Sequence, residues 1–557
     1  MKTLPASIER GDYADIDRHF AKWIGGFGRA ELPVVAAAAL SRNLRLGHIC
    51  LDLAAGPADF DAEASDDAWP SVESWLAALK ENRAVGGPGD ACPLVLDASG
   101  RLYLRRYWDY EKSLAAAILG RCDATGEAPQ SADDMQQVAV ETALARRFVV
   151  ISGGPGTGKT TTVLKILERM TGAQGGENLR IALAAPTGKA AARLEETLRG
   201  RNNALNNRLP QAAFTIHRLL GARPGSAAMR HHAGNPLPVD VMVVDEASMV
   251  PLTMMAKLLD ALPPAARVIL LGDAHQLASV EPGYVLGDIA AAARAPGSPL
   301  EGSLVELTRN FRFGDRSAIP ALSVAARDGD AKRAFEILAD AASPELSSAP
   351  VPAASALAQE LKPRVIAGYS AYLGERDPGE ALKKFQQFRV LCALRSGPYG
   401  IETINRKIEA ILRAEGLIAD SPIPRGMPVL ITRNDPDLRL FNGDTGILLP
   451  DASGSIAAWF ADGEGAMRQV APARLPEWEP AFAMTVHKSQ GSEYDNVLLM
   501  LPPAPNPVCT RELVYTGLTR ARRSVEVWFR EEALRAAIAS PVQRASGLRE
   551  RLSGRDG

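Results

Sequence analysis

The sequence predicts a multidomain α/β protein that combines two parallel-sheet domains, a small β-barrel inserted into the second of them, and a mainly helical N-terminal domain. The chain has 557 residues, several times the ~100–200 residues of one domain. From about Met135 onward, β-branched runs repeatedly precede a glycine-rich turn and an Ala- and Leu-rich helix, the order of a parallel sheet with crossover helices. Between residues 417 and 478 the apolar runs are short and separated by Asn, Gly, Asp and Pro, which is typical of a small barrel.

The first 125 residues form the predicted N-terminal domain. Their last part, PLVLDASGRLYLRRYWDYEKSLAAAIL, predicts a β-hairpin followed by a helix. The segment carries 14 basic and 18 acidic residues and four of the seven tryptophans. Because an acidic surface repels phosphate and tryptophan can anchor interfaces, we expect this domain to dock on protein rather than on nucleic acid. Core packing is the alternative role of each tryptophan.

The α/β part divides where its pattern changes. We predict a first α/β domain over residues 126–335 and a second over 336–416 and 479–557, with the β insertion at 417–478. The Ala-, Ser- and Pro-rich stretch 342–358 is typical of either an exposed linker or a surface loop. We predict the loop, because a helical pattern resumes directly after it.

Composition excludes several classes of protein. No apolar run reaches the ~18 residues of a membrane span, and the N-terminus lacks the apolar core of a secretory signal, so we expect a cytoplasmic protein. The five cysteines are far apart without a CxxC pair, which argues against a disulfide framework and against a metal site built from protein ligands alone. The net charge of -2 gives no bulk support for nucleic-acid binding.

A phosphate-binding loop, GGPGTGKT, follows the apolar run FVVIS and opens a helix. Its glycines let backbone N–H groups wrap phosphates, its lysine adds positive charge, and its first threonine can ligate Mg²⁺. We therefore predict an ATP site with Mg²⁺. The predicted residues are Gly153, Gly154, Gly156, Gly158, Lys159, Thr160 and Thr161.

Two further apolar runs end in side chains suited to ATP hydrolysis. VMVVDEASM places Asp245 and Glu246 at the end of a strand, where Asp245 would hold the metal ion and Glu246 would position and deprotonate the attacking water. RVILLGDAHQ places Gln276 where it can contact both the γ-phosphate and that water. These residues predict a hydrolase rather than a nucleotide holder.

Two arginines far along the chain, Arg312 and Arg520, are predicted to complete the site. A site between two domains uses such arginines to stabilise the charge of the transferring phosphate, and we expect both to come from the far domain. Two domains that close on ATP and open after hydrolysis make a motor.

The ordered series GGPGTGKT, APTGKAAARL, TIHRLLG, VVDEAS, LGDAHQLASVEPG, LTRNFRF, TVHKSQGSEYD and YTGLTRAR resembles the superfamily 1 DNA helicases, specifically their RecD branch, between about residues 136 and 528. The resemblance implies two RecA-like domains, an SH3-like insertion that clamps single-stranded DNA, and a strand-splitting pin near residues 228–240. It assigns Gln136 to the adenine and Glu493 to the ribose. Its DNA-facing positions fall on Thr187, Lys189, Thr215, His217, Thr485, His487, Lys488 and Gln490.

Strings outside the shared motifs, including RHHAGNPLPVDVMVVDEASM and LCALRSGPYGIETINRKIE, resemble the RecD subunits of RecBCD complexes (exodeoxyribonuclease V). This resemblance implies a 5′ to 3′ helicase that joins RecB-like and RecC-like subunits at DNA ends for recombinational repair. The nuclease would reside in a partner, since no two-metal nuclease pattern is visible. One alternative is a stand-alone RecD2-type helicase, although no helix-hairpin-helix repeats are visible. Another is a scaffold that binds ATP without unwinding, which intact Lys159 and Glu246 disfavour.

Overall fold

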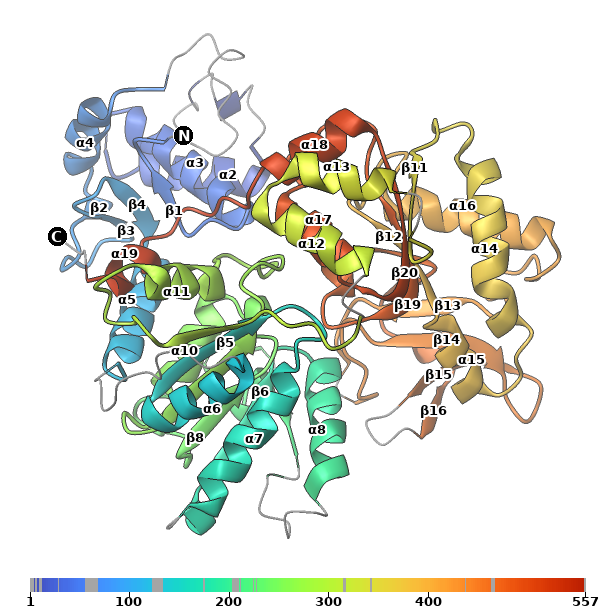
Figure 1. The fold of residues 1–557 in the computed structure, drawn as a ribbon. Helices are drawn as coiled ribbons and strands as arrows, with labels where there is room; N and C mark the ends of the chain where they lie inside the picture. The colour runs from blue at the N-terminus through green and yellow to red at the C-terminus, as the bar shows by residue number, and fades with distance from the viewer. Residues whose placement is uncertain are drawn as a thin grey trace.

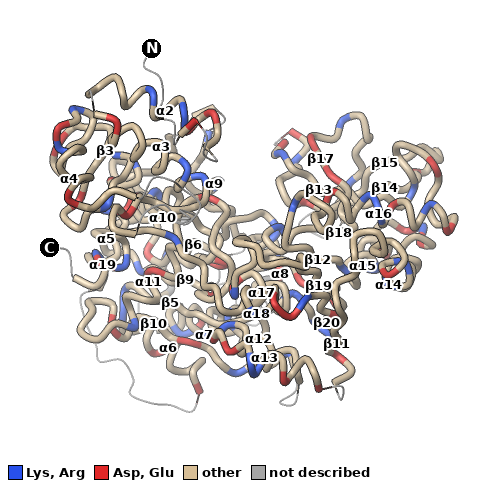
Figure 2. Tube along the Cα trace, turned by 90° about the horizontal axis from the view of Figure 1, so that it is seen from above, with Lys and Arg blue, Asp and Glu red and all other residues tan. Residues whose placement is uncertain are grey.

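The structure is a computed structural model. It describes residues 5, 8–9 and 13–554, apart from residues 29, 56–68, 123–133, 174–175, 203–209, 211, 224, 227, 314–316, 341–342, 436 and 462–465. Two large lobes lie side by side, and a smaller N-terminal domain lies at one end of the first lobe (Figure 1). Basic and acidic residues are interspersed along all three bodies, in keeping with the nearly balanced charge (Figure 2). Within the described residues, no helix is both long and apolar enough to cross a bilayer.

The first lobe is a parallel sheet with helices on both faces. Its strands are β5 (Phe148–Gly153), β6 (Ile181–Ala185), β7 (Phe214–Thr215), β8 (Val241–Val244), β9 (Arg267–Gly272) and β10 (Leu304–Leu307). Its helices are α6 (Met135–Ala145), α7 (Lys159–Gly172), η1 (Gly176–Asn178), α8 (Gly188–Asn202), α9 (Ile216–Leu219), η2 (Ala247–Met249), α10 (Leu252–Asp260) and α11 (Val285–Arg294). Among the described residues the strand order is β10-β5-β9-β8-β6-β7. Strand β5 sends Val149 and Ile151 into one core and Phe148 and Val150 into the other, as a sheet covered on both faces requires.

The second lobe repeats this architecture and confirms the predicted α/β class. Its strands are β11 (Leu346–Pro350), β12 (Phe388–Cys392), β18 (Ala483–Thr485), β19 (Tyr494–Met500) and β20 (Ala521–Phe529). Its helices are α12 (Ala318–Asp328), α13 (Ala331–Ala339), α14 (Leu357–Leu373), α15 (Pro378–Phe385), α16 (Ile401–Ala414), η4 (His487–Ser489), α17 (Arg511–Leu518) and α18 (Glu531–Ala539). In the part of the chain that is described, these strands form one sheet in the order β11-β20-β19-β12-β18, with parallel neighbours throughout.

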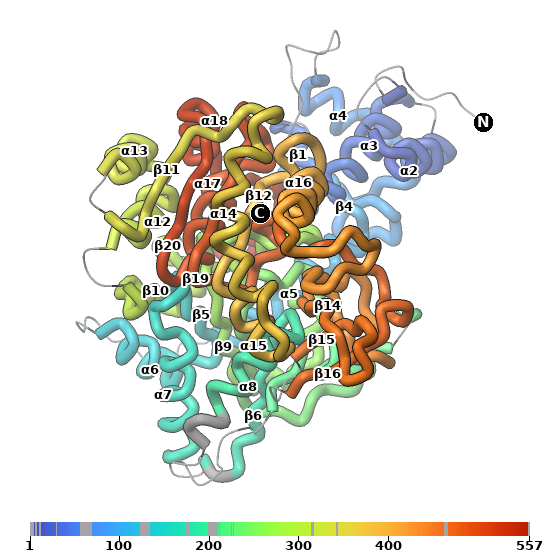
Figure 3. Tube along the Cα trace, turned by 90° about the vertical axis from the view of Figure 1, so that its right-hand side faces the viewer, coloured from blue at the N-terminus to red at the C-terminus, as the bar shows by residue number. Residues whose placement is uncertain are grey.

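The insertion is an antiparallel sheet on the outer side of the second lobe, nearest the viewer in Figure 3 together with α14 and α16. It contains β13 (Pro428–Ile431), β14 (Thr445–Pro450), β15 (Ile456–Ala461), β16 (Met467–Val470), η3 (Pro472–Arg474) and β17 (Trp478–Pro480). Its described strands follow the order β16-β15-β14-β13-β17. Val429, Ile447 and Phe460 share one core with α14 and α16, so the sheet is packed onto the lobe. The SH3-like nature of this sheet stays a prediction.

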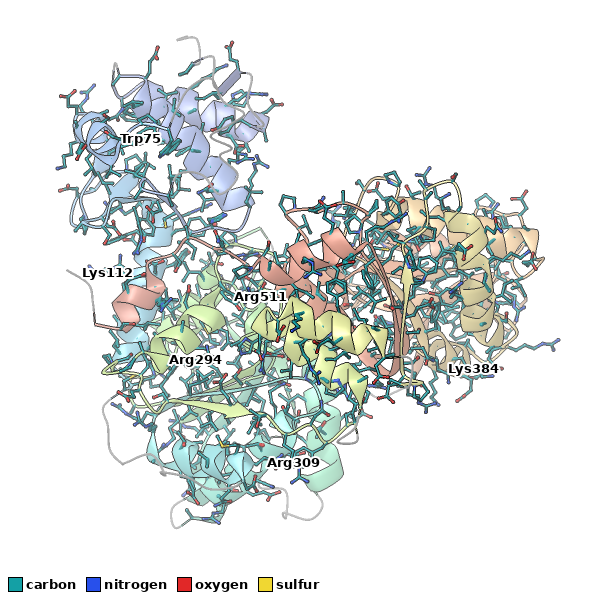
Figure 4. The ribbon with its side chains drawn as sticks, turned by 45° about the horizontal axis from the view of Figure 1, so that its top comes forward. Trp75, Lys112, Arg294, Arg309, Lys384 and Arg511 are labelled. Carbon is teal, nitrogen blue, oxygen red and sulfur yellow. The ribbon has the colours of Figure 1, made fainter. Side chains whose placement is uncertain are left out.

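The N-terminal domain packs helices against a small sheet. It contains α2 (Asp15–Gly25), α3 (Leu32–Arg45), β1 (Cys50–Asp52), α4 (Val72–Lys80), β2 (Val85–Gly86), β3 (Leu94–Leu96) and β4 (Arg101–Leu104). The predicted hairpin is confirmed as β3 and β4, which pair antiparallel, and α5 (Arg105–Leu119) follows directly. Trp75 is buried inside this domain (Figure 4).

The predicted domain boundaries need correction in three places. Helix α5 packs against α10 and the first sheet, so the first lobe begins before residue 126. Helices α12 and α13 share a core with α17 and the second sheet, so the second lobe begins before residue 336. The chain after α18 leaves the second lobe and ends in α19 (Leu548–Leu552) beside α5 (Figure 1). These contacts join segments far apart in sequence, which local patterns do not reveal.

The prediction of a surface loop at 342–358 was wrong for part of that range. Residues 346–350 form β11, the edge strand that pairs in parallel with β20. Ser347, Ser348 and Pro350 are exposed on this strand. An edge strand tolerates proline and polar residues because one side of its backbone is unpaired, and for that reason its composition resembled a loop.

A C-terminal strap, residues 541–552, ties the end of the second lobe to the other two bodies. Ala545 accepts a hydrogen bond from Ile49 N at 2.8 Å and donates to His48 Nδ1 at 2.9 Å, both in the N-terminal domain. Arg551 Nε donates to the buried Glu111 carboxylate at 3.0 Å, and its guanidinium lies 3.9 Å from the centre of the Trp108 ring. The strap therefore ends in a buried ion pair on α5.

Replacing Glu111 with alanine should detach this strap. The Glu111 side chain is fully buried and that of Arg551 is 10% exposed, so the variant removes the carboxylate of a buried ion pair, which costs about 3 kcal/mol or more. Chemical denaturation followed by intrinsic fluorescence measures the loss. The control is Glu531→Ala on α18, whose exposed pair with Arg535 should contribute less than about 1 kcal/mol. Equal losses in the two variants would contradict the anchoring role of Glu111.

Candidate functional site

A polar cavity of about 200 Å³ lies at the seam between the two lobes. Figure 4 shows Arg309 on the first lobe, Lys384 on the outer side of the second lobe, and Arg511 on the side of the second lobe that is nearest the first. The predicted nucleotide residues line this cavity, apart from Gln136 and Gly153, and they come from both lobes. Its lining is Gly154, Pro155, Gly156, Thr157, Gly158, Lys159, Thr160, Thr161, Ala190, Arg193, Leu194, Asp245, Glu246, Gln276, Arg312, Gly491, Glu493 and Arg520.

The phosphate loop connects β5 to α7. Gly156 and Gly158 both have φ of +83°, a conformation in which a side chain is strained. A Cβ on Gly156 would lie 2.8 Å from Arg312 Cβ, so the loop also needs glycine for space. Lys159 Nζ donates to the carbonyl oxygens of Gly153 and Gly154. The loop therefore folds around its lysine at the start of a helix, the arrangement that binds phosphate.

The acidic pair Asp245 and Glu246 follows β8 directly. Glu246 has φ of +51°, which is rare for a residue with a side chain and is typical of functional sites. Its N–H donates to Asp245 Oδ1 at 2.9 Å. Burial, and then the charge of Glu246, raises the pKa of Asp245 above its ordinary value. A cation would relieve both effects, and the oxygens of Asp245 and Thr160 are donors that suit Mg²⁺.

Glu493 collects arginines from both lobes instead of standing free for a ribose. Its carboxylate accepts from Arg312 Nη2 at 2.6 Å, and from Arg193 and Arg522 at 3.2 Å each. Burial alone would raise the pKa of Glu493, but Arg193 and Arg312 hold it at about 2. The prediction that Glu493 reaches the ribose is not supported by this arrangement, because its oxygens are engaged by guanidinium groups.

Of the two predicted arginines, Arg520 alone comes from the second lobe. Its Nε donates to Thr516 O at 3.1 Å and its Nη1 to Ser492 O at 3.2 Å. Arg312 follows β10, so its expected origin in the far domain was wrong, although it does line the cavity. Within the described part of the chain, Arg312 Nη1 is buried without a hydrogen-bond partner, which suits it to an anionic ligand.

The predicted adenine residue, Gln136, lies beside the loop. Its Nε2 donates to Thr157 O at 3.4 Å and its Oε1 accepts from Lys165 Nζ at 3.0 Å. Phe311, which the sequence reasoning did not single out, lies nearby. Its N–H donates to Gly156 O at 2.8 Å, and the residue is 56% exposed. An exposed phenylalanine inside the LTRNFRF string was the available signal.

Gln276 is positioned by a residue of the other lobe that the sequence reasoning also missed. Gln276 Nε2 donates to Asp273 Oδ2 at 3.2 Å, and Tyr515 OH donates to the same oxygen at 2.7 Å. Tyr515 lies on α17, within the string YTGLTRAR. It was not found because nothing local indicates a partner more than two hundred residues away.

Three of the threonines that are predicted to face DNA share one structural role. The hydroxyl oxygens of Thr187, Thr215 and Thr485 each accept a backbone N–H at 3.2 Å, at the starts of α8, α9 and η4. This arrangement leaves each hydroxyl proton for another acceptor, such as a phosphate oxygen. Lys189 Nζ donates to Ser492 Oγ at 2.8 Å, which joins α8 to the second lobe.

The other residues that are predicted to face DNA differ in their exposure to solvent. His217 is exposed on α9, and His487 and Lys488 are half-buried on η4. Gln490 is buried, and its Nε2 donates to Leu277 O of the first lobe at 2.8 Å. Its predicted DNA-facing position was wrong, because the amide bridges the lobes. The pin predicted near residues 228–240 contains a short antiparallel bridge from His232 to Asn235, and its role stays a prediction.

A phosphate loop, an acidic pair and an arginine from a second parallel-sheet lobe, all at one seam, define a two-lobed P-loop ATPase of the helicase class. Family models agree: residues 136–282 match an AAA domain, residues 480–527 a UvrD-like helicase C-terminal domain, and residues 9–103 the N-terminal domain of the RecBCD enzyme subunit RecD.

The similar proteins point to one family. The RecBCD enzyme subunit RecD of Mycolicibacterium smegmatis is 40% identical over 549 residues, 93% of each chain. That of Haemophilus influenzae is 38% identical, over 75% of this chain and 72% of its own. The chain belongs to the RecD family of DNA helicases.

Two further matches carry helicase names. The ATP-dependent RecD2 DNA helicase of Deinococcus radiodurans is 33% identical over 78% of this chain, which is 56% of its own length. Among solved structures, Pif1 helicase from Candida albicans covers 73% of this chain and 96% of its own, with 16% identity and a TM-score of 0.41.

Gly156→Ala should block nucleotide binding without unfolding the lobe. The new Cβ would meet Arg312 Cβ at 2.8 Å and Asn310 Oδ1 at 2.9 Å, which pushes the loop out of its phosphate-binding shape. We expect the affinity for an ATP analogue, measured by calorimetry, to fall at least about tenfold. Gly454→Ala is the control, since Gly454 also has φ of +83° but meets nothing within 4 Å. Equal affinities in both variants would contradict this role of Gly156.

Proposed function

We propose that this chain is the ATP-driven 5′ to 3′ helicase subunit of a RecBCD-type complex, which unwinds DNA at double-strand breaks for recombinational repair beside RecB-like and RecC-like subunits. The observation that carries the motor part is the seam cavity, where Lys159 and Glu246 of the first lobe face Arg520 of the second. A cytoplasmic location is part of the proposal.

The residues at the seam have complementary roles in hydrolysis. Lys159, Arg312 and Arg520 stabilise the charge of the transferring phosphate, and Glu246 orients the attacking water and accepts its proton. Mg²⁺ held by Thr160 and Asp245 would neutralise further phosphate charge. Phe311 offers its exposed ring to the adenine next to Gln136.

Hydrolysis moves the strand because the seam opens and closes. Thr187, Thr215 and Lys189 would hold the DNA backbone on the first lobe, and Thr485 and Lys488 on the second. Contacts to phosphate and sugar carry no sequence information, as translocation requires. When ATP draws Arg520 toward Lys159, the spacing of the two sets changes, and the strand advances in alternate steps.

A stand-alone RecD2-type helicase is the alternative. The match of residues 9–103 to the N-terminal domain of RecD favours the subunit, as does the 93% mutual coverage with a RecD subunit, against 56% of the RecD2 helicase.

Lys159→Gln should abolish DNA-stimulated ATP hydrolysis, because it removes the charge from the centre of the phosphate loop. We expect a fall of about a hundredfold or more, against no change for Lys332→Gln at an exposed position of α13. The wild type should unwind only a duplex that carries a free 5′ single-stranded tail. Full hydrolysis by the Lys159 variant would overturn the site, and unwinding from a 3′ tail alone would overturn the polarity.

The docking role of the N-terminal domain can be tested on α2. Ile16 and Trp23, two turns apart on this helix, are 61% and 51% exposed, so they can anchor a partner. The double variant Ile16→Ser, Trp23→Ser should lower recovery of the complex in co-purification by at least about tenfold, with an unchanged melting temperature. Val508→Ser, which removes a side chain 46% exposed on the second lobe, is the control. Undiminished recovery would count against docking through α2.

A further inference from the structure

Arg520 is not the only described residue of the second lobe that contacts the predicted hydrolysis site of the first lobe, because Tyr515 does so as well. Tyr515 OH donates to Asp273 Oδ2 at 2.7 Å, and this oxygen also accepts from Gln276 Nε2 at 3.2 Å. Asp273 and Gln276 are 2% and 3% exposed. Because one buried carboxylate oxygen holds both side chains, the position of Tyr515 bears directly on the orientation of Gln276.

Leu277, which directly follows Gln276 in the chain, is also held by residues of the second lobe. Leu277 N donates to Thr516 Oγ1 at 3.0 Å, and Leu277 O accepts from Gln490 Nε2 at 2.8 Å. Thr516 is fully buried and Gln490 is 7% exposed. Both backbone groups of Leu277 therefore find their partners across the seam, and a lobe movement that broke them would leave buried polar groups unpaired, at a cost.

Thr516 connects Leu277 to the arginine. Its carbonyl oxygen accepts from Arg520 Nε at 3.1 Å while its hydroxyl accepts from Leu277 N. A displacement of Thr516 therefore shifts the arginine and the Gln276 segment together.

Gln490 connects Leu277 to the surface that is predicted to bind DNA. It follows η4 directly, and its N–H donates to His487 O at 3.2 Å. In the same turn, the N–H of Lys488 donates to Thr485 Oγ1 at 3.2 Å. A DNA strand that moves this turn also moves the amide of Gln490, which is hydrogen-bonded to Leu277.

We propose that Tyr515, Thr516 and Gln490 are positioning residues of the second lobe, which hold Asp273 and Leu277 of the first lobe across the seam and thereby place Gln276 for hydrolysis. This inference rests on the proposed function. It assigns the three residues to the catalytic step rather than to the binding of ATP or DNA, because the bonds described here run between protein groups.

Conservative variants of the full chain, with any partner subunits that co-purify, test the assignment. Thr516→Val, Gln490→Met and Tyr515→Phe each remove one cross-lobe hydrogen bond at nearly constant volume. We expect kcat at saturating oligo(dT) to fall about tenfold in each. The KM for ATP and the affinity for oligo(dT) should stay within about twofold of wild type, since binding groups are untouched. Thr516→Ser, which keeps the hydroxyl, should restore kcat.

Tyr372→Phe is the matched control, because it also removes a buried tyrosine hydroxyl, bonded to Gly426 O at 2.9 Å, but within the second lobe and its insertion. Its kcat should equal that of wild type. An equal loss of kcat in the control, a weaker affinity for oligo(dT) at unchanged kcat, or unchanged kinetics in all three variants would overturn the inference. A wild type whose ATP hydrolysis does not respond to DNA would instead overturn the proposed function, and this inference with it.

Discussion

The buried guanidinium of Arg520 is the constraint on which the rest of the structure depends. It is 2% exposed, and its hydrogen bonds go to neutral oxygens of Thr516, Ser492 and Thr519. A cation removed from water costs several kcal/mol unless an anion compensates. Glu493 supplies part of that compensation, and the phosphate loop on the opposite lobe marks where a triphosphate would supply the remainder. The site is therefore complete only when both lobes are present.

Other features limit how the lobes move around this charge. Glu493 joins Arg193 and Arg312 of the first lobe to Arg522 of the second, and a triphosphate that binds the same arginines competes with it. The C-terminal strap anchors the end of the second lobe on Ile49 and on Glu111. The two lobes are thus tied by a fixed connection at the strap and by exchangeable ionic contacts at the seam, which is the arrangement of a hinge.

Much of the fold could be predicted from local patterns. The buried runs of β5, β8 and β9, each followed by a motif, identified a parallel sheet and placed Lys159, Asp245 and Gln276 at one edge. What could not be predicted depends on contacts between distant segments. The sequence of β11 resembles a loop, and only its pairing with β20 identifies it as a strand. The sequence around Gln490 suggests a contact with DNA, whereas the structure shows its amide bonded to Leu277. Glu493 gave no sign of its arginines, since those lie on three different elements.

The central claim is that the nucleotide is held at the seam by both lobes. A crystal structure of the chain with a non-hydrolysable ATP analogue, Mg²⁺ and oligo(dT) tests it most directly. The account predicts that Lys159 Nζ leaves the carbonyl oxygens of Gly153 and Gly154 for the phosphates, and that Arg312 and Arg520 each approach the γ-phosphate within about 3.2 Å. A triphosphate contacted by the first lobe alone, with Arg520 turned away, would contradict it.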